Sequence, residues 1–373
     1  MSLTYSDHYT SLSLREKVGQ LFFIGLPGED FNDLTSKLIS EIAPGGICLF
    51  ARNAKNAEKT RILLDRVRSE LQFEPYLSLD QEGGLVDRLR RIVEPIPSAS
   101  DVSANGNAEN AKRLAEITAE VIRILGFNMN FAPVVDVIDD SRAAFIMAKQ
   151  SRTFGSSKED VIEFTRVYLD ALQSGGCLGC LKHFPGIGGV QFDPHEELPS
   201  VNISKKEFYE TDLFPFTEHF ADGDVKAIMT GHTALPSLDL QETDTSGKLL
   251  PSSLSHSVVT KLLRDELGFE NLALTDDLEM GAIVKNYGIG AASKMSLMAG
   301  NDFILICNDP DAIFEGFNAV LQAAESGEIP ETRIDESLER IWRIRWSLSA
   351  PLDFDETRLA ELSLETRELK ESL

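Results

Sequence analysis

The chain has 373 residues, a formal net charge of −24 and 42% hydrophobic residues. The hydrophobic content is ordinary for a globular protein with a sizeable core, and the length suits one large domain or two small ones. Phosphate backbones select basic surfaces, so the acidic balance argues against nucleic acid and anionic membranes as partners.

The segment from Met1 to Lys17 is polar and carries both signs of charge, without the apolar stretch of a secretory signal. The cysteines, Cys48, Cys177, Cys180 and Cys307, each lie in an apolar, strand-like segment. Buried free thiols are typical of a reducing compartment, and no second cysteine pair completes a zinc site with Cys177 and Cys180. We therefore expect a cytoplasmic protein without a metal.

Short apolar runs alternate with amphipathic stretches along most of the chain. The runs predict strands at Gln20–Gly25, Gly46–Phe50, Tyr76–Asp80, Met129–Asp136, Cys177–Phe184, Ala227–Thr233, Leu272–Asp277 and Asp302–Cys307. The amphipathic stretches predict helices at Asn107–Leu125, Ser157–Gln173, Ser255–Leu267, Met295–Ala299 and Ala312–Ala324. About eight strands that alternate with helices favour an α/β fold, a (β/α)8 TIM-type barrel, over a doubly wound open sheet.

The C-terminal region predicts two further helices, Ile334–Leu348 and Glu356–Glu371. They are too short to form a second domain. We therefore predict a barrel domain over residues 1–350 and a helical extension over 351–373 that packs on the outside of the barrel.

Several predicted strands end in ionisable groups. In barrels of this kind the chemistry lies at the carboxyl ends of the strands. A single Asp could be a helix cap, but apolar strands have no packing reason to end this way repeatedly. The groups in question are Asp80, Asp136, Lys182, His183, His232, Asp276 and Asp277.

Strand alternation separates Asp276 from Asp277, because successive side chains point to opposite faces. One carboxylate should face the barrel axis and the other the helices. We expect Asp277 to cap the following helix or to pair with a basic neighbour, which leaves Asp276 for catalysis.

A glycine-rich loop follows the strand that carries Lys182 and His183, and Asp193-Pro194-His195 lies on it. Side chains two apart in an extended segment point the same way, so Asp193 can orient the imidazole of His195. This arrangement predicts a proton-transfer group.

Together these residues resemble the glycoside hydrolase family 3 beta-N-acetylhexosaminidases over roughly Leu14 to Ser347. The matching motifs are Asp80-Gln81-Glu82-Gly83-Gly84 with Arg88, Asn130-Phe131-Ala132-Pro133-Val134-Val135-Asp136-Val137, Arg152-Thr153-Phe154-Gly155, Lys182-His183-Phe184-Pro185-Gly186, Asp193-Pro194-His195, Met229-Thr230-Gly231-His232, Pro251-Ser252-Ser253-Leu254-Ser255 and Thr275-Asp276-Asp277-Leu278-Glu279-Met280.

The resemblance implies a retaining hydrolase that releases terminal N-acetylglucosamine from small glycosides, with muropeptides as a candidate substrate. It implies Asp276 as the nucleophile and His195, assisted by Asp193, as the acid/base, with no cofactor. The residues that it implies for sugar binding are Asp80, Arg88, Arg152, Lys182 and His183.

The chain departs from the family pattern at Leu85, Ile187 and Gly189, which bear on the leaving-group side of the site. Three alternatives remain open from the sequence. One is a phosphorylase, or another family 3 specificity, that uses the same site. Another is an aldolase with Lys182 as a Schiff-base nucleophile. The third is a barrel that binds sugar without turning it over.

Overall fold

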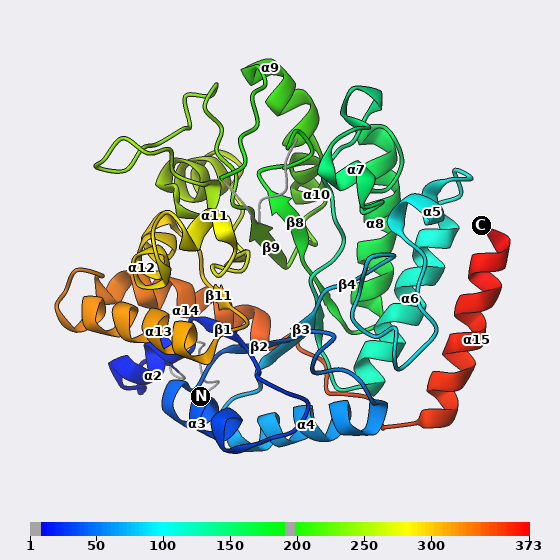
Figure 1. The fold of residues 1–373 in the computed structure, drawn as a ribbon, viewed down its shortest axis with the longest axis horizontal. Coiled ribbons are helices and arrows are strands. Elements are labelled where there is room, and N and C mark those ends of the chain that lie inside the picture. The colour runs from blue at the N-terminus through cyan, green and yellow to red at the C-terminus, as the bar shows by residue number, and fades with distance from the viewer. Residues whose placement is uncertain (1–8, 191–197) are drawn as a thin grey trace.

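The computed structural model describes residues 9–190 and 198–373. Strands lie at the centre of the molecule and helices surround them (Figure 1). The strands are β1 (Phe22–Gly25), β2 (Gly46–Leu49), β3 (Tyr76–Leu79), β4 (Gln81–Gly83), β5 (Val86–Asp87), β6 (Met129–Asn130), β7 (Leu178–Gly179), β8 (Leu181–Phe184), β9 (Ala227–Thr230), β10 (Leu272–Thr275) and β11 (Ile304–Ile306).

Within the described residues the parallel strands pair in the orders β11-β1-β2-β3-β6-β7 and β10-β9-β8, and β4 and β5 form an antiparallel hairpin. Isolated parallel bridges join Val134 to Lys182 and Leu274 to Phe303. Parallel strands buried on both faces explain the nearly continuous apolar runs in the sequence. The predicted α/β class with parallel pairing is confirmed, and closure into an eight-stranded barrel stays a prediction.

The helices alternate with the strands along the chain and cover their outer side (Figure 1). Their bounds are α2 (Leu14–Gly19), α3 (Asp33–Ile42), α4 (Ala57–Glu70), α5 (Ala99–Ser103), α6 (Glu109–Ile124), α7 (Ile146–Lys149), α8 (Lys158–Ser174), α9 (Lys205–Glu207), α10 (Phe214–Asp222), α11 (Gly281–Val284), α12 (Ile289–Ala299), α13 (Pro310–Glu325), α14 (Glu331–Arg345) and α15 (Glu356–Ser372). Short 3-10 turns occur at η1 (Asp140–Arg142) and η3 (Ser252–Leu254), and π-helical segments at η2 (Phe208–Asp212) and η4 (Ser257–Glu266).

Every predicted strand is shorter in the structure than its apolar run, and two of them change most. The run from Met129 keeps only β6, and the run from Cys177 divides into β7 and β8. Pro133 explains the break, because proline has no N–H to donate to a ladder. Its carbonyl still accepts from Lys182 N at 3.3 Å, so the two segments continue side by side.

The helix predicted from Ser255 is correct in place but differs in winding. Ser255 Oγ accepts from Val258 N at 3.3 Å, and the helical segment itself begins at Ser257. The hydrogen bonds of η4 run over five residues, as between Leu267 N and Leu262 O at 2.9 Å. Apolar spacing over so short a stretch does not distinguish this winding from an ordinary α-helix.

The C-terminal helix α15 lies against α6 (Figure 1). Arg358 donates to both carboxylate oxygens of Glu120, at 2.6 and 2.8 Å, and Leu362 is buried beneath. The predicted helix is confirmed, while the division into domains at residue 350 stays a prediction. No helix of the described residues is long and apolar enough to cross a membrane.

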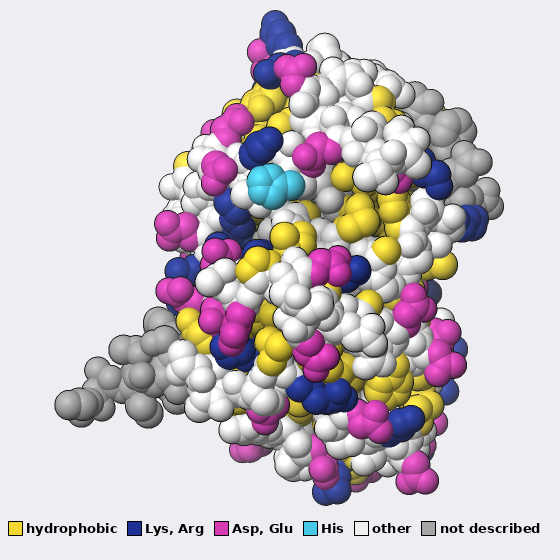
Figure 2. Space-filling model, turned by 90° about the vertical axis from the view of Figure 1, so that its left-hand side faces the viewer, with side chains coloured by type: hydrophobic (Ala, Val, Ile, Leu, Met, Phe, Trp, Pro, Cys, Tyr) yellow, Lys and Arg dark blue, Asp and Glu magenta, His cyan; other side chains and the backbone are white. Residues whose placement is uncertain are grey.

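Acidic and basic side chains are interspersed on the face of the molecule shown in Figure 2, with hydrophobic side chains between them. Although the net charge is −24, the acidic side chains do not form a single continuous patch on this face. All four cysteines are buried and free, as their apolar surroundings predicted.

Candidate active site

A cavity of about 420 Å³ opens where the parallel strands end. Asp80 follows β3, Lys182 and His183 lie on β8, and Asp276 follows β10. The predicted gathering of ionisable groups at the carboxyl ends of the strands is thereby confirmed. Apolar side chains make up much of the remaining lining, which includes Cys48, Phe50, Leu85, Val86, Phe131, Ile146, Met147, Ile187, Val190, Pro199, Met229, Met280, Leu305 and Cys307.

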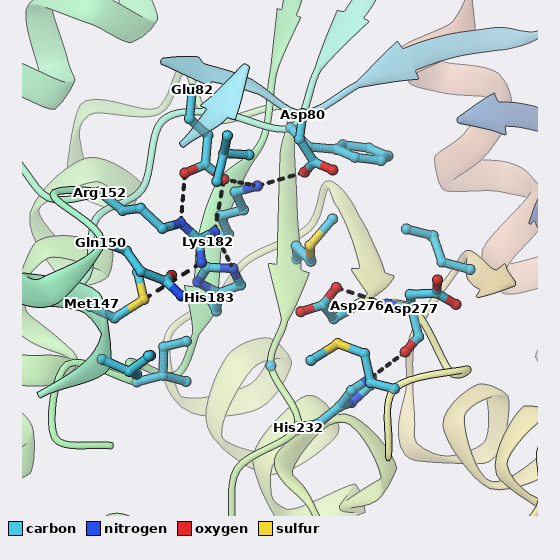
Figure 3. A pocket seen from close by; sticks show the side chains of 18 of the residues that line it. Asp80, Glu82, Met147, Gln150, Arg152, Lys182, His183, His232, Asp276 and Asp277 are labelled. Atoms are coloured by element: carbon cyan, nitrogen blue, oxygen red, sulfur yellow. Dashed lines mark hydrogen bonds and ion pairs between the residues drawn. The ribbon is translucent and has the colours of Figure 1, made fainter. Parts of the chain in front are cut away.

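Asp80 lies between two cations on one wall of the cavity, and Figure 3 shows its ion pair with one of them, Lys182. Its carboxylate is 2.8 Å from Lys182 Nζ and 3.1 Å from Arg88 Nη2. Burial opposes ionisation of this carboxyl, but the two cations outweigh burial and hold the pKa of Asp80 well below its ordinary value. Asp80 is therefore a carboxylate at neutral pH and can accept hydrogen bonds from hydroxyl groups.

Glu82 completes the same wall, although the sequence singled it out only as part of a motif. Arg152 donates to its two oxygens, each at 2.8 Å, and Lys182 Nζ lies 2.6 Å from one of them. Burial raises the pKa of Glu82, but the two cations lower it more, so that the pKa falls to about 2. Against the same burial, Asp80 and Glu82 raise the pKa of Lys182, which keeps the ammonium charged.

His183 is held by Asp136, a fully buried carboxylate. The distance from His183 Nδ1 to Asp136 Oδ2 is 2.8 Å, and Asp136 Oδ1 accepts from Ile187 N at 2.7 Å. A carboxylate accepts only, so Nδ1 carries the proton of this bond. The other ring nitrogen, Nε2, lies 3.5 Å from Arg152 Nη2 and is left as an acceptor at the cavity.

Asp276 lies on the opposite side of the cavity from the Asp80 wall (Figure 3). Its backbone N donates to Thr230 O at 3.0 Å, and its Oδ1 accepts from Asp277 N at 2.8 Å. The second oxygen, Oδ2, has no partner among the described residues, so within that part of the chain it is available to a ligand in the cavity.

Asp277 differs from its expected role. The side chain lines the cavity, and its Oδ1 accepts from Glu279 N at 3.0 Å, whereas α11 begins only at Gly281 with Met280 before it. The predicted helix cap is therefore wrong. The predicted basic partner is wrong too, because the charged groups that act on Asp277 are the acidic Glu279 and Asp276. Burial, with these carboxylates, raises the pKa of Asp277 to about 7.

The remaining predicted residues divide into two groups. Arg88 and Arg152 line the cavity with Asp80, whereas Asp193 and His195 lie outside the described residues. The site therefore brings together six of the eight residues predicted for it, namely Asp80, Arg88, Arg152, Lys182, His183 and Asp276.

The three positions that depart from the family pattern all lie within the described residues. Leu85 is 67% exposed at the cavity, and Ile187 lines it. Gly189 has no room for a side chain, since a Cβ there would lie 2.8 Å from Val201 Cγ1. Leu85 thus places an exposed apolar side chain at the cavity, and Ile187 a buried one in its lining.

Sequence reasoning missed some contributors. Glu82 stands two residues after Asp80, and this spacing could have marked it as a neighbour on the same face. Met147 and Gln150 come from the segment before Arg152, for which the sequence predicted no role. Within the residues that the structure describes, no group of three His, Cys, Asp or Glu side chains is arranged to hold a metal ion.

Known proteins are similar to this chain in sequence and in fold. A Beta-hexosaminidase from Haemophilus influenzae is 30% identical over 78% of this chain and 80% of its own length. Beta-hexosaminidase A from Pseudoalteromonas piscicida is 30% identical over 84% of this chain, which spans only 55% of that protein. The solved structure of a glycoside hydrolase family 3 beta-N-acetylglucosaminidase from Paenibacillus sp. has a TM-score of 0.86 and 33% identity, over 96% of this chain and 69% of that one.

The pattern of the Glycosyl hydrolase family 3 N terminal domain matches residues 13–344, which include every described residue of the cavity. The chain belongs to glycosyl hydrolase family 3.

Proposed function

We propose that the protein is a retaining beta-N-acetylhexosaminidase that releases terminal N-acetylglucosamine from small glycosides through a glycosyl-enzyme on Asp276. One observation carries the proposal. Across the cavity, the free oxygen of Asp276 faces a wall of fixed charged groups that suit sugar hydroxyls. A retaining mechanism needs such a carboxylate nucleophile beside a bound sugar ring. The names of the relatives and of the Paenibacillus structure agree with it.

The wall supplies donors and acceptors in a fixed pattern. Asp80 accepts hydrogen bonds from hydroxyls. His183 Nε2, the unprotonated nitrogen because Asp136 holds the proton on Nδ1, can accept from a hydroxyl by exchanging its 3.5 Å contact with Arg152 Nη2. Arg88, Arg152 and Lys182 donate. Each of these cations already has a carboxylate partner, so a neutral sugar binds to preformed polar groups.

We assign the acid/base role to His195 with Asp193. Val190 and Pro199, which flank the segment that contains both residues, line the cavity. A histidine titrates near neutrality, and a neighbouring carboxylate stabilises its protonated form. It can protonate the leaving-group oxygen as the bond from Asp276 to the anomeric carbon forms. It then takes a proton from water, whose oxygen attacks the anomeric carbon and displaces the Asp276 carboxylate, so that the sugar leaves and the acid/base is again protonated.

The aldolase alternative conflicts with the surroundings of Lys182. A Schiff-base lysine needs a neutral amine, whereas Lys182 lies between two carboxylates that raise its pKa. In the part of the cavity that the structure describes, no feature favours phosphate over water as the acceptor, so phosphorolysis is an outcome of the test below.

Two further proposals complete the assignment. Isolated parallel bridges at Val134–Lys182 and Leu274–Phe303 support closure of the strands into one barrel. The apolar side chains of Leu85 and Ile187 in the cavity lining favour an aglycone with an apolar surface, and muropeptide fragments are one substrate class to test.

The test is a kinetic panel of aryl glycosides that differ only in the substituent at C2 of the sugar, assayed with and without phosphate. We expect turnover of the 2-acetamido sugar and its loss in Asp276→Ala. Full activity of that variant overturns the nucleophile. A preference for the 2-hydroxy sugar overturns the hexosaminidase assignment, and a sugar 1-phosphate product overturns hydrolysis.

A further inference from the structure

His232 lines the cavity beside Asp276 but has no described role in sugar binding. The residue lies just after β9, and its side chain is buried. Both ring nitrogens have protein partners. Nε2 lies 3.0 Å from the backbone carbonyl oxygen of Asp277, and Nδ1 lies 2.7 Å from Ser253 Oγ. The ring therefore has no nitrogen left for a sugar hydroxyl.

The partners fix the tautomer of His232. A carbonyl oxygen only accepts, so Nε2 carries the proton and donates to Asp277. Burial lowers the pKa of His232, so the ring is neutral and Nδ1 accepts from the Ser253 hydroxyl. The neutral ring thus links Ser253 to the backbone of Asp277 through two hydrogen bonds, and the bond with Ser253 fixes the orientation of the bond with Asp277.

Ser253 is itself anchored. It is fully buried, its N donates to Gly231 O at 3.2 Å, and its carbonyl accepts from Asn301 Nδ2 at 2.8 Å. The neighbouring Ser252 N donates to Thr233 O at 2.9 Å. The turn that carries Ser253 is therefore joined to the backbone on both sides of His232.

The backbone of Asp277 is held at both of its ends. Its carbonyl accepts from His232, and the N–H of the same peptide, on Leu278, donates to Leu305 O at 2.9 Å. Its own N–H donates to Asp276 Oδ1 at 2.8 Å (Figure 3). That last bond limits rotation of the Asp276 carboxylate and leaves Oδ2 as the free oxygen.

We propose that His232 and Ser253 are positioning residues that hold the Asp277 backbone and thereby aim the Asp276 carboxylate at the anomeric carbon. The proposal rests on the proposed function, in which Asp276 is the nucleophile. Attack on an anomeric carbon is sensitive to displacements of about 1 Å, which cost on the order of 100-fold in rate. His232 acts on the reaction through Asp277 and touches no reacting atom.

Two amide variants separate the two hydrogen bonds of His232. In His232→Gln the side-chain amide nitrogen reaches the position of Nε2 and can donate to the Asp277 carbonyl. In His232→Asn the shorter amide can contact Ser253 but does not reach Asp277. We expect kcat on an aryl N-acetylglucosaminide to fall about 100-fold in His232→Asn with KM changed less than about threefold, and kcat to recover at least about tenfold in His232→Gln.

Ser253→Ala is a milder third variant, since it removes only the hydroxyl that fixes the tautomer. We expect its kcat to fall by up to about tenfold, the effect of one neutral hydrogen bond. His219→Asn is the matched control, because His219 is a buried histidine with one hydroxyl partner, Thr165 Oγ1 at 2.8 Å, and lies outside the cavity lining. It should lower the melting temperature and leave kcat unchanged.

The outcomes distinguish this proposal from the proposed function. Equal losses of kcat in His232→Asn and His232→Gln, or a rise in KM with kcat retained, overturn the positioning role alone. A fall of kcat in the His219 control similar to that in His232→Asn does the same, since it would reflect stability. Absence of turnover by the unsubstituted protein overturns the proposed function, and the positioning role with it.

Discussion

Arg152 and Glu82 form a two-point ion pair on one wall of the cavity, with both N···O distances at 2.8 Å. Lys182 shares the Glu82 carboxylate at 2.6 Å and also contacts Asp80. The wall is thus a chain of alternating charges in which every member has a partner. The side chains that should bind sugar are fixed by one another, and Glu82 links two of them.

Glu82→Gln should weaken both sugar binding and stability. The change leaves Arg152 and Lys182 with less negative charge in a buried place, and removal of one member of a buried ion pair costs about 3–5 kcal/mol. We expect KM to rise at least about tenfold and the free energy of unfolding to fall by roughly that energy, measured by urea denaturation.

The control for this prediction is Glu120→Gln, which removes a partner of Arg358 between α6 and α15. A pair so exposed to solvent contributes about 0–1 kcal/mol. Similar losses of stability in the two variants would contradict the special role of Glu82.

Asp136→Asn should impair the His183 side of the site. An amide at this position can donate toward Nδ1 and so favour the wrong tautomer, with the proton on Nε2. We expect kcat/KM to fall by about 10–100-fold, the usual effect of losing a residue that orients a functional histidine. NMR of the ring nitrogens would report the tautomer, and an unchanged tautomer with unchanged kinetics would contradict the assignment.

Stability should depend on pH through Asp277. Its pKa rises from 3.8 to about 7 on folding, so the folded chain binds this proton more tightly than the unfolded chain does. The resulting stabilisation is fully present below the unfolded pKa and is lost as the pH rises through about 7. We expect Asp277→Asn to gain roughly 2–4 kcal/mol relative to the unsubstituted protein between pH 4 and pH 8.

Urea denaturation of both proteins across this pH range measures the difference directly. Because the two proteins share every other titrating group, the comparison isolates Asp277. A constant difference in unfolding free energy across the range would show that the Asp277 carboxyl does not titrate there.

The cysteines should resist modification in the folded protein. The hydrogen bond with Cys48 and burial raise the pKa of Cys307, and burial raises the pKa values of Cys177 and Cys180. The thiolate is the reactive form, so we expect negligible reaction with a chromogenic disulfide at pH 8 and reaction of all four thiols in urea. Rapid reaction of one thiol in the folded state would contradict this burial.

The sequence predicted the fold class and most of the described site because both depend on local patterns. Apolar runs marked the strands, and ionisable groups at their ends marked the cavity, since parallel strands bring their carboxyl ends to one edge. The division of the Cys177 run depended on a proline in a neighbouring segment. The effect of this proline depends on which segments pair in the folded chain, so the residues of the Cys177 run alone could not have predicted it.

The errors at Asp277 and Glu82 have a common cause. Each was judged from its own neighbours in the chain, whereas its role depends on groups from other elements. Arg152 and Lys182 give Glu82 its place, and the Asp277 backbone is held by His232 from the segment after β9. Such long-range partners are settled only when the strands are assembled.

The charged wall also affects how much of the binding energy is lost to ordering of side chains when the sugar binds. Lysine and arginine side chains lose considerable rotational freedom when they are ordered, and a site that orders them on binding gives up affinity. Here Lys182 and Arg152 are already immobilised by Asp80 and Glu82 before any sugar arrives. The entropy cost of ordering these side chains is therefore part of the folding free energy and is not charged to sugar binding. More of the binding energy then remains to distort the sugar ring toward the transition state.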